Sequence, residues 1–543
     1  MTLRLSLNKK SVDRVVQRFV SLPLFEIVIV LSIVLAIVST YLSYQNHTII
    51  SYGDAESHLN IAKRVVNSLT PGAAQLGGIW LPLPHVLMLP FIWSNFLWRS
   101  GLAGSIVSGI CFLITSMYLY KLTLFLTKNK FASFIASLVF ITNPNILYMQ
   151  ATPMTELPLI AFFVLNSYFF IRYLHNRENL IDLILAAFYG FCATLTRYDG
   201  WIIVLIEAGI IGLLYTGLFD FLKELVRGQV KRFSLISQKG EGILVMYCTL
   251  AFFGVALWLG WGALILKNPL YFTTSQFSAK SQQKGWLAKG QLPAYKNLPS
   301  AFVYYTATSM SNVGILIFAV AIVSYIVFIK DKNTDHAFFT SLVLLSPFIF
   351  YVLTLYMGQS LIFIPSITPV GFEWRLFNVR YGLMMIPTCA LLFAYLFHKA
   401  KNPGRLVLLA LFILQFGLYA NGYSRVVSYD DATIGLSANK YPDAVSWLAK
   451  NYTGGLLVMD DYKRIFSVIT SQLPMENIIY IGTKPYWEET LAAPQSHAQW
   501  IILQKDDALW KQFFDTPEKQ GRLYKFYKKV YTSEDILIFE RNL

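Results

Sequence analysis

The sequence predicts a polytopic α-helical membrane protein with a small α/β domain at its C-terminal end. Hydrophobic residues make up 55% of the 543 residues, charged residues make up only 14%, and the mean hydropathy is +0.50. A soluble domain usually carries about a quarter charged residues. Apolar runs of about 20 residues recur, and each is long enough to cross a bilayer core of about 30 Å. Together these observations indicate many membrane spans.

Apolar runs alternate with polar turns from residue 24 to residue 422. By the bilayer-length criterion they predict about eleven spans. The spans fall at 24–42, 102–126, 131–148, 157–174, 181–196, 201–219, 243–266, 313–329, 337–357, 381–397 and 406–422. The run at 80–98 is short and broken by prolines, so it is expected to be re-entrant or interfacial. If it did span, every later loop would change side.

Basic clusters beside the spans set the predicted orientation. They comprise Lys9, Lys10, Arg14 and Arg18, then Lys223, Arg227, Lys231 and Arg232, and then Lys399, Lys401 and Arg405. Positive charge gathers on the cytoplasmic side of membrane proteins, which places the N-terminus in the cytoplasm of a cell that carries the protein in its plasma membrane. The same clusters account for the net charge of +15 without a nucleic-acid partner. An odd number of spans puts the C-terminal end outside.

The chain changes character after residue 422. Apolar runs shorten at 456–459, 478–481 and 500–503, and polar stretches that suit helices follow them. Segments 526–531 and 536–540 resemble a closing hairpin. Short buried strands that alternate with helices predict a small α/β fold. We therefore expect a membrane domain over 1–422, with an outer loop at 43–100, and an extracytoplasmic α/β domain over 423–543.

An acidic motif follows the first span. Asp54, Glu56 and His58 lie within five residues, in a chain that is poor in charge. Apolar residues at 55, 59, 62, 65, 66 and 69 predict a helix that lies along the membrane surface, with Asp54 and His58 on one face. Asp54 at the start of this helix could cap backbone amides, or it could carry out chemistry with Glu56. His85 follows in the same outer loop and is a further candidate for substrate binding.

Other polar residues fall at outer turns. Glu156 lies between two prolines and is either a solvated loop residue or a site residue. Arg197 and Asp199 could form a local ion pair or join a site. Arg375, Arg380 and Tyr381 enter a late span, where arginine either snorkels to lipid headgroups or grips a phosphate. Lys280 and Lys284 lie in a polar loop with aromatic residues, which suits an anionic headgroup or a solvated loop.

These motifs resemble those of the GT-C glycosyltransferases, which use polyprenyl-phosphate-linked sugars. The resemblance rests on Asp54-Ala-Glu56 in the first outer loop, on the helix after it, on Arg380-Tyr381 and on an outer C-terminal domain. It is strongest for the protein O-mannosyltransferase and aminoarabinose-transferase branch, and the segment 196–201 is similar to a turn of such enzymes. Asp-x-Glu spacing is closer to oligosaccharyltransferases, which use a divalent metal, although their Trp-Trp-Asp motif is absent from the sequence.

The resemblance implies transfer of a sugar from a polyprenyl (dolichyl) phosphate donor to a hydroxyl of a protein, lipid or glycan by an inverting displacement. Asp54, with Glu56, would be catalytic, and a metal at these two acids stays open. Arg380 would bind the donor phosphate, with Arg375, Tyr381 or Arg197. No glycine-rich nucleotide loop or zincin motif is found, so no other cofactor is expected.

Two other functions remain open on the sequence. A transporter of lipid-linked glycans would explain the spans, but it needs neither the acidic loop nor a large C-terminal domain. A polymerase or ligase that uses diphosphate-linked glycans would share the outer face and the basic loop. The donor distinguishes the three, because only the transferase consumes a monophosphate-linked sugar.

Overall fold

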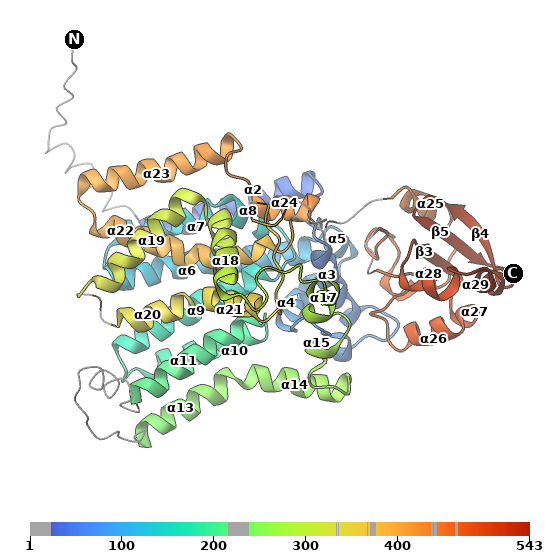
Figure 1. The fold of residues 1–543 in the computed structure, drawn as a ribbon, viewed down its shortest axis with the longest axis horizontal. Helices are drawn as coiled ribbons and strands as arrows, with labels where there is room; N and C mark the ends of the chain where they lie inside the picture. Colours follow the sequence, from blue (N-terminus) through green and yellow to red (C-terminus); the bar gives the residue numbers. More distant parts are fainter. Residues whose placement is uncertain are drawn as a thin grey trace, which may run out of the picture.

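The structure is a computed structural model that describes residues 23–215, 238–332, 334, 336–365, 367–369, 376–435, 438, 442–461 and 465–542. The basic residues expected before the first span and after the sixth lie outside the described residues, and so does Arg375. The described chain forms a long helical bundle that leads into a C-terminal part built around a sheet (Figure 1).

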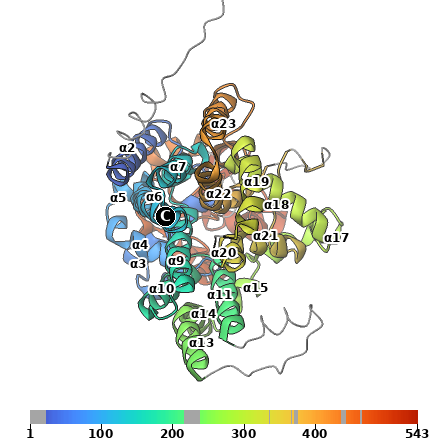
Figure 2. The same cartoon turned by 90° about the vertical axis from the view of Figure 1, so that its left-hand side faces the viewer.

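Five helices are long and apolar enough to cross a membrane by length and composition, counted over the described residues. They are α2 (Leu24–Gln45), α6 (Leu102–Thr127), α9 (Glu156–His175), η2 (Val379–Met385) continued by α22 (Ile386–Lys399), and α23 (Asn402–Ala420). Viewed from the end away from the C-terminal sheet, α6, α9 and α22 lie centrally, whereas α2 and α23 lie at the periphery (Figure 2). The peripheral helices expose apolar side chains such as Ile37 and Leu406, as helices that face lipid do.

Four helix pairs are sharply bent, and counting each as one span raises the total to as many as nine in the described part of the chain. They are α7 (Lys130–Ile141) with α8 (Pro144–Gln150), α13 (Gln238–Ala251) with α14 (Phe253–Ile265), α18 (Leu298–Val313) with α19 (Ile315–Lys330), and α20 (Ala337–Leu344) with α21 (Ser346–Tyr356). The sharpest bend, 117° between α18 and α19, occurs at Gly314, whose φ is +95°. A β-carbon there would lie 2.6 Å from the Gln415 side chain, so only glycine fits this turn.

The predicted count of eleven spans is not confirmed. Two predicted spans correspond to α10 (Leu180–Thr194), of 15 residues, and α11 (Asp199–Tyr215), of 17 residues up to the end of the described segment. A helix rises about 1.5 Å per residue, so α10 covers only about 23 Å. Short apolar helices of this kind can be buried among neighbours, and apolar content alone does not separate them from full spans.

The outer loop folds into α3 (Gly53–Val66), η1 (Ala73–Gln75), α4 (Leu83–Ile92) and α5 (Asn95–Arg99). The predicted helix forms as α3, and ten of its 14 residues are buried in the protein; that it lies along the membrane surface stays a prediction. Its polar residues have protein partners: Lys63 donates to the carbonyl oxygen of Ile92, and Arg64 donates to the Tyr480 hydroxyl at 3.2 Å. α4 has ten residues and is too short to cross a bilayer.

All strands of the described residues belong to one five-stranded sheet near the C-terminal end. The order is β2 (Ile478–Ile479), β1 (Leu457–Val458), β3 (Trp500–Gln504), β5 (Ile536–Arg541) and β4 (Tyr527–Thr532). The first three are parallel, and β5 is antiparallel to both β3 and β4. Each short apolar run of the sequence thus contains a buried strand. The helices of this part are α25 (Ala444–Asn451), η3 (Met475–Asn477), α26 (Tyr486–Ala492), α27 (Pro494–His497), α28 (Ala508–Phe513) and α29 (Pro517–Tyr524).

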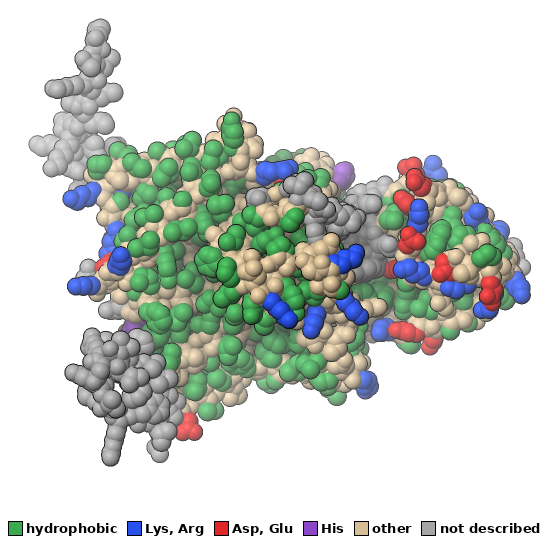
Figure 3. Space-filling view, in the orientation of Figure 1, with side chains coloured by type: hydrophobic (Ala, Val, Ile, Leu, Met, Phe, Trp, Pro, Cys, Tyr) green, Lys and Arg blue, Asp and Glu red, His purple; other side chains and the backbone are tan. Residues whose placement is uncertain are grey.

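Charge is distributed unevenly over the molecule. Apolar side chains cover the flank of the bundle, whereas acidic and basic side chains gather over the C-terminal part (Figure 3). Along the long axis, the outer-loop helices and the short helices α15 (Tyr271–Thr274), α16 (Ala279–Gln282) and α17 (Lys284–Ala288) lie between the two (Figure 1). The segment between α23 and α25 contains α24 (Val427–Ile434). Segments that are far apart in the sequence therefore meet at this end of the bundle.

Candidate functional site

Arg380 lies at the centre of a buried charged cluster at the end of the bundle nearest the sheet. Its Nη2 donates to Asp54 Oδ2 at 2.6 Å, and its Nε donates to Glu156 Oε1 at 3.1 Å. Its Nη1 lies 3.7 Å from Asp431 Oδ2 and has no hydrogen-bond partner among the described residues. Only 3% of the Arg380 side chain is exposed. A buried guanidinium needs such carboxylate partners, because an unpaired charge in this position is very costly.

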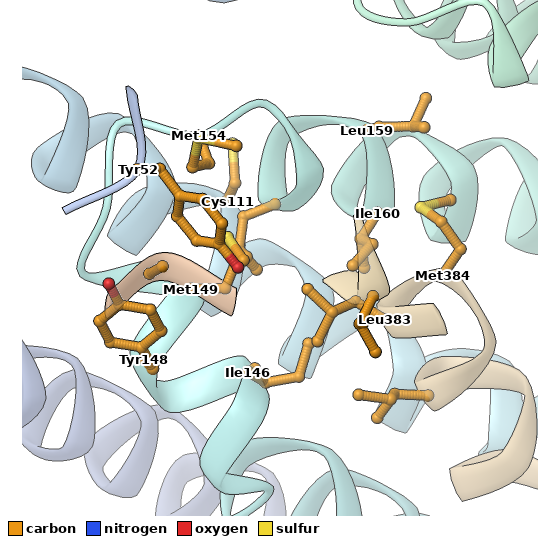
Figure 4. Packing of buried hydrophobic residues seen from close by; sticks show 14 of the residues in the cluster. Tyr52, Cys111, Ile146, Tyr148, Met149, Met154, Leu159, Ile160, Leu383 and Met384 are labelled. Atoms are coloured by element: carbon orange, nitrogen blue, oxygen red, sulfur yellow. The ribbon is translucent and has the colours of Figure 1, made fainter. Parts of the chain in front are cut away.

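The turn that carries Arg380 is held closely by its neighbours. Asn312 Nδ2 donates to the carbonyl oxygen of Val379 at 2.7 Å, and a β-carbon at Gly382 would collide with the carbonyl of Thr308 on α18. Behind the arginine, Leu383 packs among apolar side chains that include Ile160 of α9 and Ile146 of α8 (Figure 4). Tight packing on this side fixes the direction in which the guanidinium points.

Glu156 joins Arg380 to a second arginine. Its Oε1 accepts from both Arg380 and Arg197 Nη1, the latter at 3.0 Å, while its Oε2 is buried with no hydrogen-bond partner in the described chain. Arg197 Nε lies 3.6 Å from Asp199, which also accepts a hydrogen bond from the Tyr351 hydroxyl. The ring of Tyr381 lies beside both guanidinium groups, at 5.2 Å from Arg197 and 5.4 Å from Arg380. Arg197 and Asp199 therefore belong to the cluster as well as forming a local pair.

Asp54 is the most open carboxylate of the cluster. Its side chain is 22% exposed, compared with 1% for Glu156 and none for Asp431. The residue before α3 is Tyr52, and no side chain caps this helix. The Asp54 carboxylate thus points to Arg380 rather than serving as an N-cap. Because it is both charged and partly open, it is the carboxylate best placed to meet a molecule that enters from outside.

Asp431 is a site residue that the sequence analysis missed. It lies in α24, where Tyr52 donates its hydroxyl to the carbonyl oxygen of Ser428 at 2.6 Å and approaches Asp431 Oδ2 at 3.4 Å. Burial raises the pKa of Asp431 to about 6, the charge of Asp54 adds to the rise, and Arg380 opposes it. The feature of the sequence that could have indicated it is the pair of adjacent aspartates just after the last predicted span. In the sequence alone this pair resembles an ordinary acidic linker.

Other predicted site residues lie away from Arg380. Glu56 is buried, and its Oε1 accepts from the backbone nitrogen of Ile469 at 2.7 Å. His58 Nδ1 and His85 Nε2 are 2.9 Å apart, beside the ring of Trp80. Successive helix residues differ by about 100°, so Asp54 and Glu56 point in nearly opposite directions. Glu56 therefore contacts the C-terminal part, whereas Asp54 contacts the bundle.

Lys280 and Lys284 lie on α16 and α17, and both are exposed. The segment from 267 to 330 contains no acidic residue, so its basic charge is not neutralised by residues of its own.

Burial lowers the pKa of His85 well below its ordinary value, and His58 adds to the effect. A neutral His85 makes the two-histidine contact part of the packing between α3 and α4.

Asp54 and Glu56, where the sequence leaves a metal site open, do not come together as a pair in this arrangement. The Asp54 carboxylate pairs with Arg380, while Glu56 accepts from a backbone amide of another segment. Within the described ranges, no group of three or more His, Cys, Asp or Glu residues could hold a metal ion. The residues present thus do not match a divalent-metal site at Asp54 and Glu56.

Two solved structures share this fold. The structure is similar to ArnT from Cupriavidus metallidurans bound to undecaprenyl phosphate, with a TM-score of 0.54 and 10% identity over 93% of this chain and 97% of that one. It is also similar to the oligosaccharyltransferase AglB from Archaeoglobus fulgidus, in complex with an inhibitory peptide and a dolichol-phosphate. That match has a TM-score of 0.51 and 10% identity over 95% of this chain and 74% of that one.

No protein-family model and no curated protein matches the sequence. At 10% identity the two structural similarities establish the fold, and the predicted GT-C fold is thereby confirmed. With its apolar helices, the chain is a multi-pass membrane protein. What it does has to be argued from its own residues.

Proposed function

We propose that the protein is a glycosyltransferase that moves a sugar from a polyprenyl-phosphate donor to an acceptor hydroxyl. The observation that carries this proposal is the Asp54–Arg380 pair at 2.6 Å, in which a partly open carboxylate meets a buried arginine at the end of a membrane bundle. The undecaprenyl phosphate and the dolichol-phosphate held by the two similar structures favour a lipid phosphate as the anion.

Arg380 is suited to bind the donor phosphate. A guanidinium presents several N–H donors in a planar fork, and this geometry matches phosphate oxygens. In the absence of donor, Asp54 occupies Nη2, while Nη1 has no hydrogen-bond partner among the described residues. A phosphate oxygen that binds at the Asp54 side would replace one anion by another at the same nitrogen. Arg197 and Tyr381 hold the rest of the cluster in place around it.

The same exchange prepares Asp54 to act as the base. Once Arg380 holds the phosphate, the Asp54 carboxylate can accept the proton of the acceptor hydroxyl. The acceptor oxygen then forms a bond to the anomeric carbon, and the bond from that carbon to the phosphate oxygen breaks. The electron pair leaves with the phosphate, whose added negative charge Arg380 stabilises. Attack opposite to the leaving phosphate would invert the configuration of the sugar.

The proposed location is the outer face of the plasma membrane. The basic cluster of Lys399, Lys401 and Arg405 begins at the far end of α22 from Arg380, which places the Arg380 cluster outside if positive charge lies inside. The C-terminal part, which contacts Glu56 through the Ile469 nitrogen, then lies outside too. In this arrangement the segment that contacts Glu56 would face an incoming protein, lipid or glycan acceptor.

Purified protein incubated with polyprenyl-phosphate sugars tests this function. We expect release of polyprenyl phosphate when a suitable acceptor is present, and loss of this release in Asp54→Asn. A protein that acts only on diphosphate-linked glycans would instead be a polymerase or ligase. Movement of lipid-linked glycan across a vesicle membrane without release of phosphate would identify a transporter. Glu207→Gln is the matched control, because it replaces another buried carboxyl of the same bundle.

A further inference from the structure

Among the described residues, the Arg380 cluster contains more acids than bases. Ion pairs within it join four carboxylates, those of Asp54, Glu156, Asp199 and Asp431, to two guanidinium groups, those of Arg197 and Arg380. With every group ionised, the described cluster therefore carries four negative and two positive charges. A phosphodiester-linked sugar adds one more negative charge. Such an anion enters a low-dielectric site unfavourably unless positive charge enters with it or a negative charge disappears.

Asp431 is the acid whose charge is least well compensated. Its side chain is completely buried, its Oδ1 has no hydrogen-bond partner in the described part of the chain, and its nearest cation, Arg380 Nη1, is 3.7 Å away. Its hydrogen bond from Tyr52 is long, at 3.4 Å. Asp54 and Glu156, in contrast, lie 2.6 and 3.1 Å from Arg380 nitrogens. Burial also raises the pKa of Asp431 to about 6, so its proton is gained near neutral pH.

The groups packed around Asp431 cannot take over this role. On α8, Tyr148 donates its hydroxyl to the carbonyl oxygen of Thr48. On α18, Tyr304 and Tyr305 donate to backbone carbonyls of Ile367 and Tyr381. All three are phenols and stay neutral at physiological pH, as does Tyr52, whose pKa burial raises well above its ordinary value. The carboxylates of Asp54, Glu156 and Asp431 are the ionisable groups that face Arg380 at this point.

The next residue provides a contrast on the same helix. Asp430 is paired with Arg425 at 2.8 Å, and its side chain is 20% exposed. Its charge is therefore compensated near the surface, outside the Arg380 cluster. Neighbouring acids of the same type thus have different partners, which makes Asp430 a matched control for Asp431.

We propose that Asp431 is a positioning residue that takes up a proton when the donor phosphate binds to Arg380. This inference rests on the proposed function. The proton comes from solvent and neutralises Asp431, so the occupied cluster keeps the same net charge as the empty one. Arg380 Nη1, which lies toward Asp431, then becomes available to the phosphate beside Nη2. When polyprenyl phosphate leaves, Asp431 returns the proton to solvent.

Calorimetric titration of the full-length protein in detergent tests the inference. The probe is farnesyl methyl phosphate, a phosphodiester whose single charge does not titrate between pH 5 and 8. Titrations at pH 7.5 in two buffers of different ionisation enthalpy give the number of protons taken up. For the wild type we expect close to one proton per bound probe, and a Kd that rises by up to about tenfold for each pH unit above about 6. Asp431→Asn should bind without proton uptake and with a Kd that is flat over pH, while Asp430→Asn should behave as the wild type.

Each outcome bears on the proposal. Binding by the wild type without proton uptake overturns the inference and leaves the proposed donor site intact. This comparison uses the wild type alone, so it does not depend on whether a variant folds. Wild-type uptake that persists in Asp431→Asn also overturns it, because another group then gains the proton. Binding that is lost on addition of EDTA would assign the compensating charge to a divalent cation and overturn the inference. A wild type that does not bind the probe at any pH contradicts the phosphate site itself, and the inference fails with it.

Discussion

Two buried carboxylate sites in the bundle differ in their partners. In the Arg380 cluster, Glu156 shares one oxygen between two arginines, and the cluster ends in the partly exposed Asp54. Farther along the bundle, Glu207 of α11 is completely buried and accepts from Asn166 Nδ2 at 2.9 Å and from the Tyr247 hydroxyl. Asn166 also donates to the carbonyl oxygen of Ala186, so these contacts connect α9, α10, α11 and α13.

The difference separates the proposed site for chemistry from a structural contact. The partners of Glu207 in the described chain are neutral donors from helices that pack against one another, and neither partner is a charge that a ligand could replace. Arg380 instead holds carboxylates at three nitrogens, and one of these carboxylates belongs to a residue that solvent can reach. An ionisable residue within a membrane bundle is a candidate for function by default. The hydrogen-bond partners of each buried carboxyl and its exposure to solvent decide which residue is retained as a candidate for function.

The largest expected effect comes from removing the central arginine. Arg380→Ala should abolish transfer and also lower the free energy of unfolding by about 3–5 kcal/mol, because it leaves buried carboxylates without a cation. The readouts are donor turnover and denaturant unfolding. Arg172→Ala is the matched control. Arg172 pairs with Asp182 at 3.1 Å near the other end of α9, and its side chain is 35% exposed. Equal losses of donor turnover in Arg380→Ala and Arg172→Ala would mean that Arg380 has only a structural role.

Asp54→Asn should affect catalysis with little effect on folding. Loss of a general base removes about a hundredfold to ten-thousandfold of the rate. Asn keeps the size of the side chain and one oxygen that can accept from Arg380, so thermal unfolding should change little. Single-turnover measurements with bound donor isolate this step. Wild-type rates in Asp54→Asn would remove Asp54 from the mechanism.

Much of this contrast could be predicted from the sequence. Span counting and outer turns bring Asp54, Glu156, Arg197 and Arg380 to one end of the bundle, and the structure places these four in one cluster. The GT-C fold was also predictable, because a short acidic motif and a late Arg-Tyr pair fall in the right order along many apolar runs. Prediction works here because membrane topology restricts each polar residue to one of two faces.

What could not be predicted depends on tertiary packing. Asp54 and Glu56 look like a pair in the sequence, but a helix turns them to opposite sides, and the partner of Glu56 lies more than 400 residues away in the chain. The contacts of Tyr351 and Tyr305 with polar groups could not be predicted either. Both residues occur in apolar runs, where aromatic residues usually belong to a core. The span count is not confirmed, because apolar helices of 15 to 17 residues and sharply bent pairs have the composition of full spans.

Glu56 sharpens the comparison, because it tests whether the second acid of the motif takes part in the reaction. Glu56→Gln keeps an oxygen that can accept from the Ile469 nitrogen, so activity and stability should stay close to the wild type. Glu56→Ala leaves that buried nitrogen unpaired and should cost about 1–3 kcal/mol of stability. Thermal unfolding and turnover of both variants check this. A loss of turnover in Glu56→Gln like that of Asp54→Asn would return Glu56 to the mechanism.

The smallest expected effect is at Glu207. Glu207→Gln keeps an oxygen that can accept from Tyr247 or Asn166, and the net change in hydrogen bonding should be about 1 kcal/mol or less. Transfer should continue at nearly the wild-type rate, as measured by release of lipid phosphate. A rate as low as that of Asp54→Asn would show that a carboxyl with neutral partners can also be essential, and the distinction drawn between the two sites would fail.

The central claim is that Arg380 binds the phosphate of a lipid-linked donor. The most direct measurement is the Kd of undecaprenyl phosphate for the wild type, Arg380→Lys and Arg172→Lys, with all three shown to be folded by thermal unfolding. Lysine keeps the charge but lacks the planar fork, so Arg380→Lys should bind about tenfold more weakly, which corresponds to about 1.4 kcal/mol. Arg172→Lys should bind as the wild type does. Unchanged binding in the folded Arg380→Lys protein would contradict the account.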